Sequence, residues 1–364
     1  MKLIFICGSL EEGKDGVGDY TRRLASELIK LGHEVRIIAI HDRLIKLSIN
    51  GVQKIDGKVI NVLRLPSILK WELRIELAKD YLNVFNPDRL CLEYVPFSFN
   101  KRGIPFFLAS KLKAIASDRA WLIMFHELWL GMEIGASMKH IIWGCVQKTL
   151  IRSLVRKLNV KAIYTQSLLY LSQLKSLGLE PNLLPLFGNI PVINEEESLT
   201  EKNLSFVIFG GIHHGSDIIS FAKELQEISL ITQLKVEVIF VGRNGFQKED
   251  WINVLENAKI NFVDMGEQSI YNISKIFLGS TFGVTTTPYI LTDKSGSVAS
   301  MREHGLIIIC LGRSWNVEGF QHPYGSEHLK KFEKGNLSAL IKLKNPLPDH
   351  SSLVKVAKEF EKNL

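Results

Sequence analysis

The sequence is poor in cysteine and has no long apolar run. Its 364 residues include four cysteines, Cys7, Cys91, Cys145 and Cys310, and no CxxC spacing. Scattered cysteines argue against a disulfide framework and against a cysteine-ligated metal site, so we expect buried reduced thiols. No apolar run approaches the ~18 residues needed to cross a bilayer. The apolar N-terminal stretch meets Glu11 too soon for a signal peptide, and we therefore expect a cytoplasmic protein.

The chain does have enough apolar material for two cores. A hydrophobic fraction of 46% with 23% charged residues is typical of a globular protein, and 364 residues suggest two domains. The net charge of +7 suits phosphorylated small molecules, an anionic membrane surface or nucleic acid. The basic residues are dispersed without aromatic interleaving, so no nucleic-acid partner is expected.

The first half alternates short apolar runs with helical patterns, which predicts a parallel sheet built from βαβ units. The first run is followed by a glycine-containing loop and by a helix with Leu24, Leu28 and Leu31 on one face. The expected strands are Lys2–Cys7, Val35–Ile40, Val59–Leu63, Arg89–Glu93, Ala120–Phe125, Lys161–Thr165 and Leu183–Leu186.

The glycine loop, GKDGVGDY, contains Gly16, Gly18 and Asp19 but does not have the GxGxxG spacing. The expected second strand ends at Ile40, which is not the acidic residue of a dinucleotide fingerprint, and His41 and Asp42 follow it. The loop therefore argues against a nicotinamide cofactor.

Polar residues end two of the predicted middle strands. Glu93 closes one, and His126 with Glu127 follows the next. Ligands of parallel sheets bind outside the carboxyl ends of the strands, so these side chains are candidates for chemistry. The alternative for each is a hydrogen-bonded loop residue at the edge of a sheet.

The composition shifts once, at Gly188-Asn189-Ile190-Pro191 and the acidic run after it. We take this shift as a linker and expect four parts. They are an N-terminal domain over residues 1–187, a linker over 188–203, a C-terminal domain over 204–345, and a terminal helix over 346–364 that crosses back to the first domain.

The second half repeats the pattern of apolar strands followed by polar or glycine-rich turns. Because parallel strands end at one edge, these turns should converge, and the candidate ligand contacts among them are His213, His214, Arg243, Gly266, Glu267, Gln268 and Thr287. Arg243 can offer a planar fork to a phosphate, with a surface ion pair as its alternative. For His213 and His214 the alternative is that they only fill a turn.

The segment Lys294-Ser295-Gly296-Ser297 predicts a helix start that binds an anion. Ser295 or Ser297 can cap the helix, and Gly296 lets a ligand approach the backbone N–H groups. A cation such as Lys294 is disfavoured beside a helix N-terminus unless something negative lies between them. The alternative is an ordinary capped helix.

Residues 139–159 predict a basic amphipathic helix. Such a helix either lies on an anionic membrane surface or buries one stripe and exposes a solvated basic face. We favour the solvated face, and a peripheral contact with the inner face of the plasma membrane stays open.

Taken together, these features resemble the GT-B glycosyltransferases, in particular retaining members of the group 1 or family 4 type. Gly16 to Tyr20 looks like the family's first-strand loop, Phe125 to Leu128 like the segment that supplies a histidine beside the donor sugar, and Gly188 to Pro191 like the entry to the linker. The resemblance implies two doubly wound α/β domains facing across a cleft. It also implies a nucleotide-sugar donor, with UDP-glucose or another UDP-hexose expected from family frequency, and a saccharide or lipid-linked saccharide acceptor.

The sequence departs from that family in two places. An Arg and a Lys that usually follow the first strand of the second domain are missing, with His213 and His214 standing nearby, and the paired glutamates are absent. Many retaining members carry two glutamates before the penultimate helix, whereas this chain has Ser300 at the second position and Thr292 or Asp293 near the first. Fixed N–H dipoles with Lys294 and Arg243 would stabilise the departing diphosphate, so neither a metal nor a bound cofactor is expected. If the reaction inverts configuration, Asp19, Glu127 or His126 must accept the acceptor proton.

Two rival functions follow from the same residues. One is a sugar-nucleotide epimerase of the same architecture, which would convert the donor without an acceptor. The other, suggested by the missing glutamates, is a non-catalytic protein that binds sugar nucleotides within a polysaccharide assembly.

Overall fold

The computed structural model describes residues 1–116, 118–193, 203–323 and 326–364. The chain divides into two compact units. Unit 1 comprises Met1–Pro185, Val317–Phe320 and Leu353–Leu364, and unit 2 comprises Leu186–Asn316 and Gln321–Ser352. Residues 194–202, the larger part of the expected linker, lie outside the described residues.

Unit 1 is built on an eight-stranded sheet with the order β3-β4-β2-β1-β5-β6-β7-β8. The strands are β1 (Lys2–Cys7), β2 (Glu34–Asp42), β3 (Ile49–Ile55), β4 (Lys58–Pro66), β5 (Arg89–Tyr94), β6 (Ala120–Phe125), β7 (Asn159–Thr165) and β8 (Pro181–Leu183). All neighbouring pairs are parallel except the β3–β4 hairpin, where Asp56 and Gly57 have the positive φ angles that a tight two-residue turn requires. In this sheet β2 lies on one side of β1 and β5 lies on the other. The topological switch point is therefore between β1 and β5.

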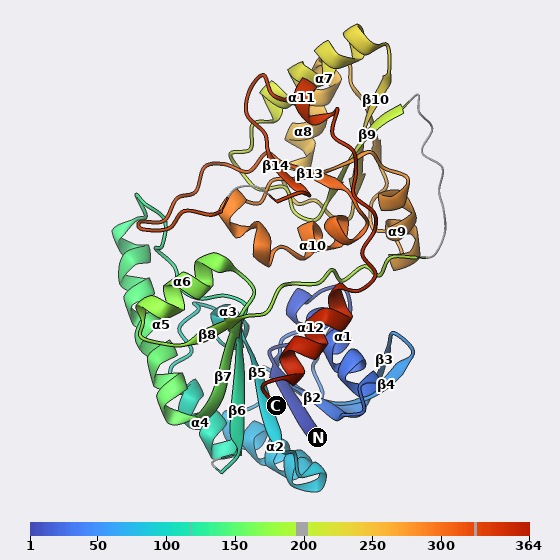
Figure 1. The fold of residues 1–364 in the computed structure, drawn as a ribbon. Coiled ribbons are helices and arrows are strands. Elements are labelled where there is room, and N and C mark those ends of the chain that lie inside the picture. The colour runs from blue at the N-terminus through green and yellow to red at the C-terminus, as the bar shows by residue number, and fades with distance from the viewer. Residues whose placement is uncertain (117, 194–202, 324–325) are drawn as a thin grey trace. The chain divides into compact units, whose positions relative to one another are not determined.

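Helices flank this sheet (Figure 1). They are α1 (Gly16–Lys30), α2 (Trp71–Phe85), α3 (Pro96–Phe99), α4 (Leu108–Ile115), α5 (Met138–Lys157), α6 (Leu168–Ser176) and α12 (Ser352–Glu361). The C-terminal helix α12 belongs to unit 1, because Phe360 stacks on Phe5 of β1 at 5.8 Å and contacts Tyr164 of β7 at 5.4 Å between ring centroids. β6 is apolar along its whole length, and β1 and β5 are buried over five of their six residues, as the cover of a parallel sheet on both faces requires.

Unit 2 contains a six-stranded parallel sheet with the order β11-β10-β9-β12-β13-β14. Its strands are β9 (Asn203–Phe209), β10 (Lys235–Val241), β11 (Asn261–Asp264), β12 (Phe282–Thr285), β13 (Ile307–Cys310) and β14 (Leu329–Lys331). Its helices are α7 (Ile218–Thr232), α8 (Lys248–Asn257), α9 (Ile270–Leu278), the 3-10 helix η1 (Tyr289–Lys294), α10 (Gly296–Glu303) and α11 (Leu337–Leu340).

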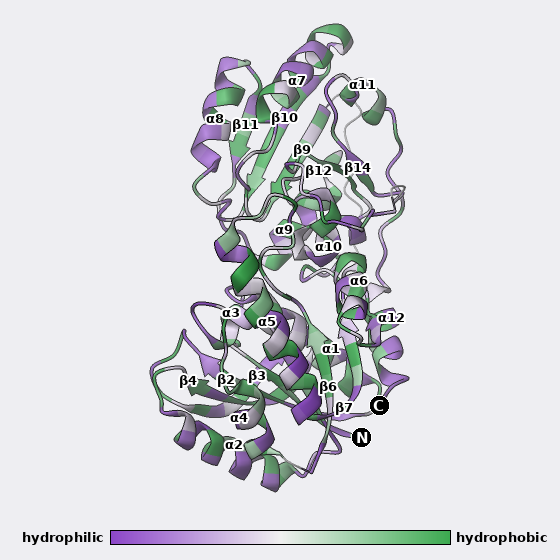
Figure 2. Ribbon diagram, turned by 90° about the vertical axis from the view of Figure 1, so that its left-hand side faces the viewer, coloured by the Kyte–Doolittle hydropathy of each residue, from purple (hydrophilic) through white to green (hydrophobic). Residues whose placement is uncertain are grey.

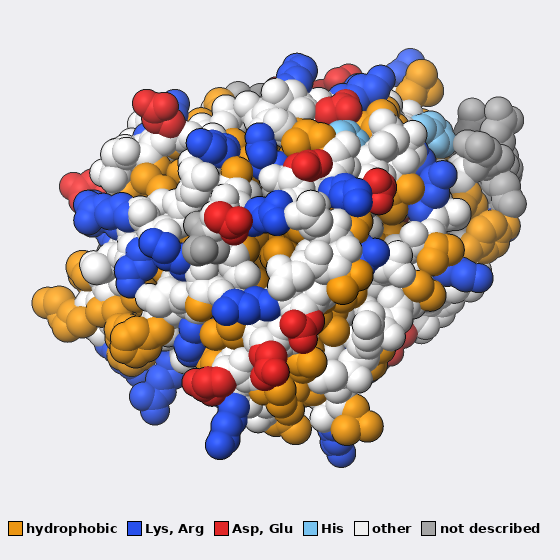
Figure 3. Space-filling model, turned by 90° about the horizontal axis from the view of Figure 1, so that it is seen from below, with side chains coloured by type: hydrophobic (Ala, Val, Ile, Leu, Met, Phe, Trp, Pro, Cys, Tyr) orange, Lys and Arg blue, Asp and Glu red, His pale blue; other side chains and the backbone are white. Residues whose placement is uncertain are grey.

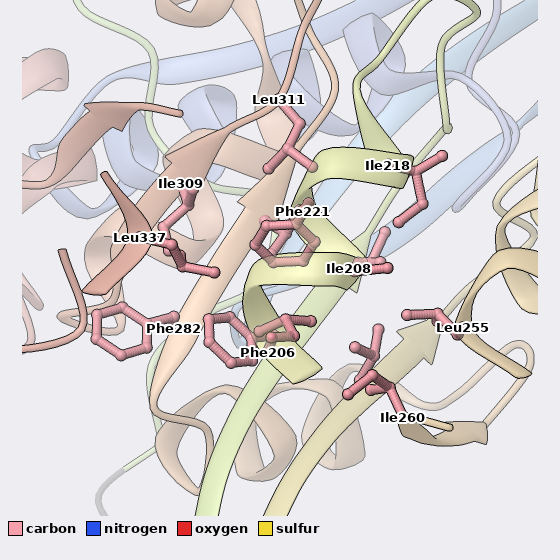
Figure 4. Packing of buried hydrophobic residues seen from close by; sticks show 14 of the residues in the cluster. Phe206, Ile208, Ile218, Phe221, Leu255, Ile260, Phe282, Ile309, Leu311 and Leu337 are labelled. Carbon is pink, nitrogen blue, oxygen red and sulfur yellow. The ribbon is translucent and has the colours of Figure 1, made fainter. Parts of the chain in front are cut away.

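The core of unit 2 is rich in aromatic side chains (Figure 4). Phe206 of β9 stacks on Phe282 of β12 at 5.5 Å and meets Phe221 of α7 edge-on at 5.6 Å. Colouring by hydropathy shows the same division in both units, with hydrophobic strands and mixed helix surfaces (Figure 2). Both units are therefore α/β Rossmann-like domains, which confirms the predicted fold class.

Charge is spread over the surface. On the face drawn in Figure 3, lysine and arginine side chains alternate with acidic and apolar ones and form no single basic patch. In the described part of the chain, no helix combines the length and the hydropathy needed to span a bilayer.

Candidate functional site

The strands of unit 2 end in glycine-rich or polar turns at one edge of the sheet. β9 is followed by Gly210 and Gly211, β10 by Gly242 and Arg243, and β12 by Thr286. Hydrogen bonds join these turns to one another, because Ile212 N–H donates to Asn244 O at 2.8 Å and Gly242 N–H donates to Gly266 O at 2.7 Å. The turns therefore form one connected rim.

The closest approach in this rim is between Gly210 and the first turn of α10. A Cβ atom on Gly210 would lie 2.2 Å from Ser297 Oγ, and Gly210 has a φ angle of +92°. Both facts demand glycine. Ser295 is the N-cap of α10, and its Oγ accepts a long hydrogen bond of 3.4 Å from Val298 N–H. The helix start predicted from the sequence is therefore present and lies against the end of β9.

His213 and Lys294 belong to the same corner. Thr286 Oγ1 accepts from His213 N–H at 2.8 Å and lies 3.0 Å from His213 Nδ1, which holds the β9 loop against the end of β12. Desolvation lowers the pKa of His213, and the positive charge of Lys294 lowers it further, so the two side chains are close enough to interact. We call the group formed by Gly210–His214, Thr286 and Lys294–Ser297 the α10 corner.

The remaining candidates of unit 2 lie along the same rim with less burial. Arg243 Nε donates to Glu267 Oε1 at 2.9 Å, with both side chains more than half exposed. Gln268 donates to Met265 O at 2.5 Å and accepts from Asn272 Nδ2 at 3.1 Å. Arg243 therefore forms a surface ion pair in this structure, which is the alternative to phosphate binding named for it above.

His214 and Thr287 differ in burial. His214 is exposed, whereas the carbonyl oxygen of Thr287 accepts a hydrogen bond from Cys310 Sγ at 3.2 Å. A Cβ atom on Gly312 would lie 2.3 Å from that same carbonyl oxygen. The backbone of Thr287 therefore packs against the end of β13.

Ser300, which the resemblance aligned with the second glutamate, accepts a hydrogen bond from the backbone. Its side chain is buried, and its Oγ accepts from Asn189 N–H at 3.1 Å. Glu303, one turn later, accepts from Gly188 N–H at 2.8 Å. The side chains of Ser300 and Glu303 therefore hold the backbone of Gly188 and Asn189, near the start of unit 2.

In unit 1 the candidate residues gather beside the switch point. His126 Nε2 donates to Glu93 Oε2 at 2.5 Å, and both side chains are almost fully buried. The backbone N–H of His126 donates to Tyr94 O at 3.1 Å, which fixes the start of the loop after β6. Among the described residues His126 Nδ1 has no hydrogen-bond partner. Glu127, the next residue, is half-buried.

Two residues that the sequence analysis did not select complete this group. Tyr20 packs its ring edge-on against His126 at 5.0 Å. Asp15 is the N-cap of α1 and accepts from Val17 N–H at 3.1 Å and Gly18 N–H at 2.9 Å. Burial raises the pKa of Asp15, while the charge of His126 acts in the opposite direction. An aspartate before a helix is an N-cap signal, which could have identified Asp15.

The other loop candidates have structural roles. A Cβ atom on Gly18 would lie 2.6 Å from Ser9 O, so only glycine fits there. Asp19 accepts from Gly13 N–H at 3.2 Å and pairs with Arg22, and burial raises its pKa. Gly16 is exposed, with open space where a Cβ atom would lie.

Each unit therefore offers a distinct chemical group. Unit 1 holds a buried imidazole paired with a carboxylate, and unit 2 holds a corner of backbone N–H groups with a lysine. No group of three or more His, Cys, Asp or Glu side chains suited to a metal ion occurs among the residues that the structure describes.

Comparison with known proteins identifies the fold. No family model and no curated protein matches the chain. A glycosyltransferase of Rickettsia africae is 13% identical with a TM-score of 0.59, covering 100% of this chain and 92% of its own. Anabaena HepE, solved with UDP and glucose, is 12% identical with a TM-score of 0.59, covering 100% and 98%. A UDP-N-acetylglucosamine 2-epimerase is 11% identical with a TM-score of 0.54, covering 99% and 95%.

At these identities the likeness concerns the fold alone. It extends over both units, because the matched structures cover 99% to 100% of the chain. The chain therefore has the GT-B fold, the arrangement of Rossmann-like domains that glycosyltransferases share with UDP-N-acetylglucosamine 2-epimerases.

Proposed function

We propose that this protein is a glycosyltransferase that moves a hexose from a nucleotide diphosphate donor to a hydroxyl group of a saccharide or lipid-linked saccharide in polysaccharide biosynthesis. The GT-B fold supports this proposal, and so does the presence of UDP and glucose in the similar Anabaena structure. UDP-glucose is accordingly the first donor to test.

The observation that carries the proposal is the α10 corner. Gly210 brings the end of β9 against Ser297, and Lys294 stands beside the same helix start. The helix N-terminus has a partial positive charge and free N–H donors, so an anion bound there would be stabilised. A leaving diphosphate gains negative charge as the glycosidic bond breaks, and fixed dipoles with a cation lower the energy of that transition state.

Unit 1 is proposed to act on the sugar. Glu93 orients the imidazole of His126 through Nε2, and this leaves Nδ1 for a hydroxyl group of the substrate. Asp15, whose pKa is raised by burial, is a second candidate to exchange a proton in this region.

A thermal-shift panel of UDP-, GDP-, ADP- and dTDP-sugars tests the donor assignment. A donor that binds the native state raises the melting temperature by mass action, and the selective one identifies the base. Transfer is then measured with that donor and saccharide acceptors. Absence of a shift with every nucleotide sugar would contradict the proposal.

Lys294→Ala tests the corner itself. Losing a charge-assisted hydrogen bond of about 1.5 to 3 kcal/mol should weaken the binding of the nucleoside diphosphate by at least about tenfold. Lys344→Ala, at an exposed position of the same unit, is the matched control and should leave the affinity unchanged. Calorimetric titration measures the affinity of each variant for the nucleoside diphosphate. Equal affinities would show that Lys294 does not contact the ligand.

An epimerase is the second candidate, because a UDP-N-acetylglucosamine 2-epimerase matches the chain at a TM-score of 0.54 over 99% of its length. The two functions differ in their need for an acceptor. Conversion of a UDP-sugar to its epimer by the protein alone, followed by proton NMR, would favour the epimerase. A donor that stays unchanged until a saccharide is added would favour the transferase.

A further inference from the structure

A pocket lies in unit 1, beside β2 and β4. Its volume is about 590 Å³, and it is lined by the end of β2, the start of α2 and the segment after β5. The polar or aromatic side chains used below are His41, Arg43, Trp71, Lys101 and Arg102. β2 runs parallel to β1, so the pocket shares a sheet edge with the carboxyl end of β1.

Positive charge is concentrated around Trp71. The guanidinium carbon of Arg74 lies 4.0 Å from the ring centroid of Trp71, and Lys111 Nζ lies 4.4 Å from it. Arg43, on the pocket wall, donates to Phe97 O at 2.8 Å. Within the described ranges no carboxylate lies within 4.0 Å of the charged nitrogens of these three cations. Cation–π contacts offset part of their charge, but each adds only ~0.5–2 kcal/mol.

Arg74 stands apart from the other buried arginines of unit 1. Arg22, Arg23 and Arg64 are each paired with an aspartate. Arg74 is 3% exposed and donates only to uncharged acceptors, Ile40 O at 3.0 Å and His41 Nδ1 at 2.7 Å. Its Nε is buried without a partner. Buried charges are normally paired, but Glu72 of the first turn of α2 acts on Arg74 electrostatically without forming an ion pair with it, so the charge of Arg74 is only partly balanced.

The neighbouring groups also favour an anion. His41 Nδ1 accepts from Arg74, so the imidazole proton lies on Nε2, where it is a donor. Burial and the cations Arg74, Arg43 and Lys111 lower the pKa of His41 to about 4. At the start of α2, which is 15 residues long, the N-cap is Lys70, whose side chain makes no capping hydrogen bond. A lysine at this position interacts unfavourably with the helix dipole, whereas Glu72 in the first turn interacts favourably.

We infer that this pocket binds a phosphate group carried by the acceptor substrate. A phosphate ester carries about −1.5 to −2 charges near neutral pH and three acceptor oxygens, whereas a carboxylate carries a single charge. Arg43, Lys101 and Arg102 line the pocket, and Arg74 and Lys111 lie beside it on the ring of Trp71. A phosphate or diphosphate balances this positive charge better than a carboxylate does. Arginine and lysine are also the usual partners of phosphate.

The phosphate itself follows from the pocket, but its assignment to an acceptor rests on the proposed function. The two claims are tested separately in one experiment. Phenylglyoxal modifies accessible arginines, and peptide mass spectrometry on the full chain reports each arginine individually. Arg43 reports on the pocket, Arg243 on the α10 side of unit 2, and the exposed Arg156 of α5 serves as the control.

Inorganic pyrophosphate should slow the modification of Arg43 by at least about threefold and leave Arg156 unchanged, because bound phosphate covers the guanidinium. Vesicles of phosphatidylcholine with phosphatidylglycerol, against phosphatidylcholine alone, form the second arm. Protection by pyrophosphate indicates a soluble phosphate-bearing substrate, and protection by the anionic vesicles alone indicates a lipid-borne one. Both results support a phosphate site.

Lys101→Gln, on the pocket wall, should raise the pyrophosphate concentration needed for protection of Arg43 by about tenfold, as expected for one charge-assisted contact. Lys113→Gln, an exposed lysine of helix α4 that does not line the pocket, should leave it unchanged. Equal protection by glucuronate would overturn the choice of phosphate, and no protection by any phosphate arm would overturn the site. If Arg43 is protected by pyrophosphate while UDP-sugars leave Arg243 unprotected and are not transferred, the pocket stands and the proposed function falls.

Discussion

At the scale of single residues, Gly210 determines how the α10 corner closes. Its positive φ angle turns the chain after β9, and its missing side chain makes room for Ser297 Oγ. Gly211, its neighbour, has open space where a Cβ atom would lie and no positive φ angle. The two glycines therefore form a natural pair for comparison.

Gly210→Ala should destabilise unit 2 by about 1–3 kcal/mol and weaken nucleotide binding, because both the backbone angle and the contact with Ser297 oppose a methyl group. Gly211→Ala should change the free energy of unfolding by less than about 0.5 kcal/mol. Urea unfolding of the two variants measures this. Equal losses at both positions would show that the close approach does not constrain the corner.

At the scale of elements, His304 ties three segments of unit 2 together. His304 Nδ1–H donates to Ser300 O at 2.7 Å, so Nε2 accepts from Ser274 Oγ of α9, also at 2.7 Å. Ser274 Oγ in turn accepts from Ile193 N–H at 3.2 Å. The chain before residue 194, helix α9 and the end of α10 are thus held by one neutral imidazole.

This arrangement predicts a pH dependence. Burial is the main cause that lowers the pKa of His304 from its ordinary value of 6.5 to about 4. Between these values the unfolded chain binds the extra proton, so stability present above about pH 6.5 is lost as the pH falls towards about 4, by up to ~3 kcal/mol. His304→Gln should be less stable at neutral pH and should lose less stability on acidification.

Urea titrations of the unsubstituted protein and of His304→Gln at about pH 7 and about pH 4.5 measure the slope of the unfolding free energy against pH for each protein. The two slopes differ if proton uptake by His304 opposes folding. His140→Gln, at an exposed site on α5, is the control and should keep the slope of the unsubstituted protein. An unchanged slope for His304→Gln would assign the acid sensitivity to other groups.

The elements also show what a sequence can predict. The strands Lys2–Cys7 and Ala120–Phe125 were predicted with the bounds that the structure has, because both are continuous apolar runs. β3 was not predicted, since its residues alternate between exposed and half-buried positions on a hairpin. The strand expected at Leu183–Leu186 lies at Pro181–Leu183 instead.

The site was predictable only in outline. Strand ends placed His126 and the polar turns of unit 2 at the sheet edges, because parallel strands end together. Asp15 beside His126 and Thr286 beside His213 come from segments far apart in the chain, and no spacing in the sequence reports such contacts. Likewise, the sequence does not show that Arg74 forms no ion pair with any carboxylate of the described residues, because this depends on which side chains fold around it.

At the scale of the whole molecule, the chain has two separate compact units. Domains with their own cores can unfold separately, so we expect two transitions in differential scanning calorimetry. A nucleotide sugar at 100 times its Kd should stabilise unit 2 by about 2.7 kcal/mol and raise one transition only.

In Lys294→Ala, at the same ligand concentration, a tenfold loss of affinity should reduce that stabilisation to about 1.4 kcal/mol or less. Both transitions should remain, because the substitution removes a ligand contact and no core residue. The scans of the two proteins, each with and without the nucleotide sugar, provide the comparison. A single transition that moves as a whole would contradict separate unfolding.

The edges of the two sheets affect how the molecules behave at high concentration. Unit 2 ends in β11 and β14, of four and three residues, and unit 1 ends on one side in the three-residue β8. Such short borders offer few unpaired backbone groups to another molecule. The opposite border of unit 1 is the seven-residue β3, where Ile49 and Val52 are exposed. Intermolecular strand addition, the first step towards aggregation, would therefore begin at β3.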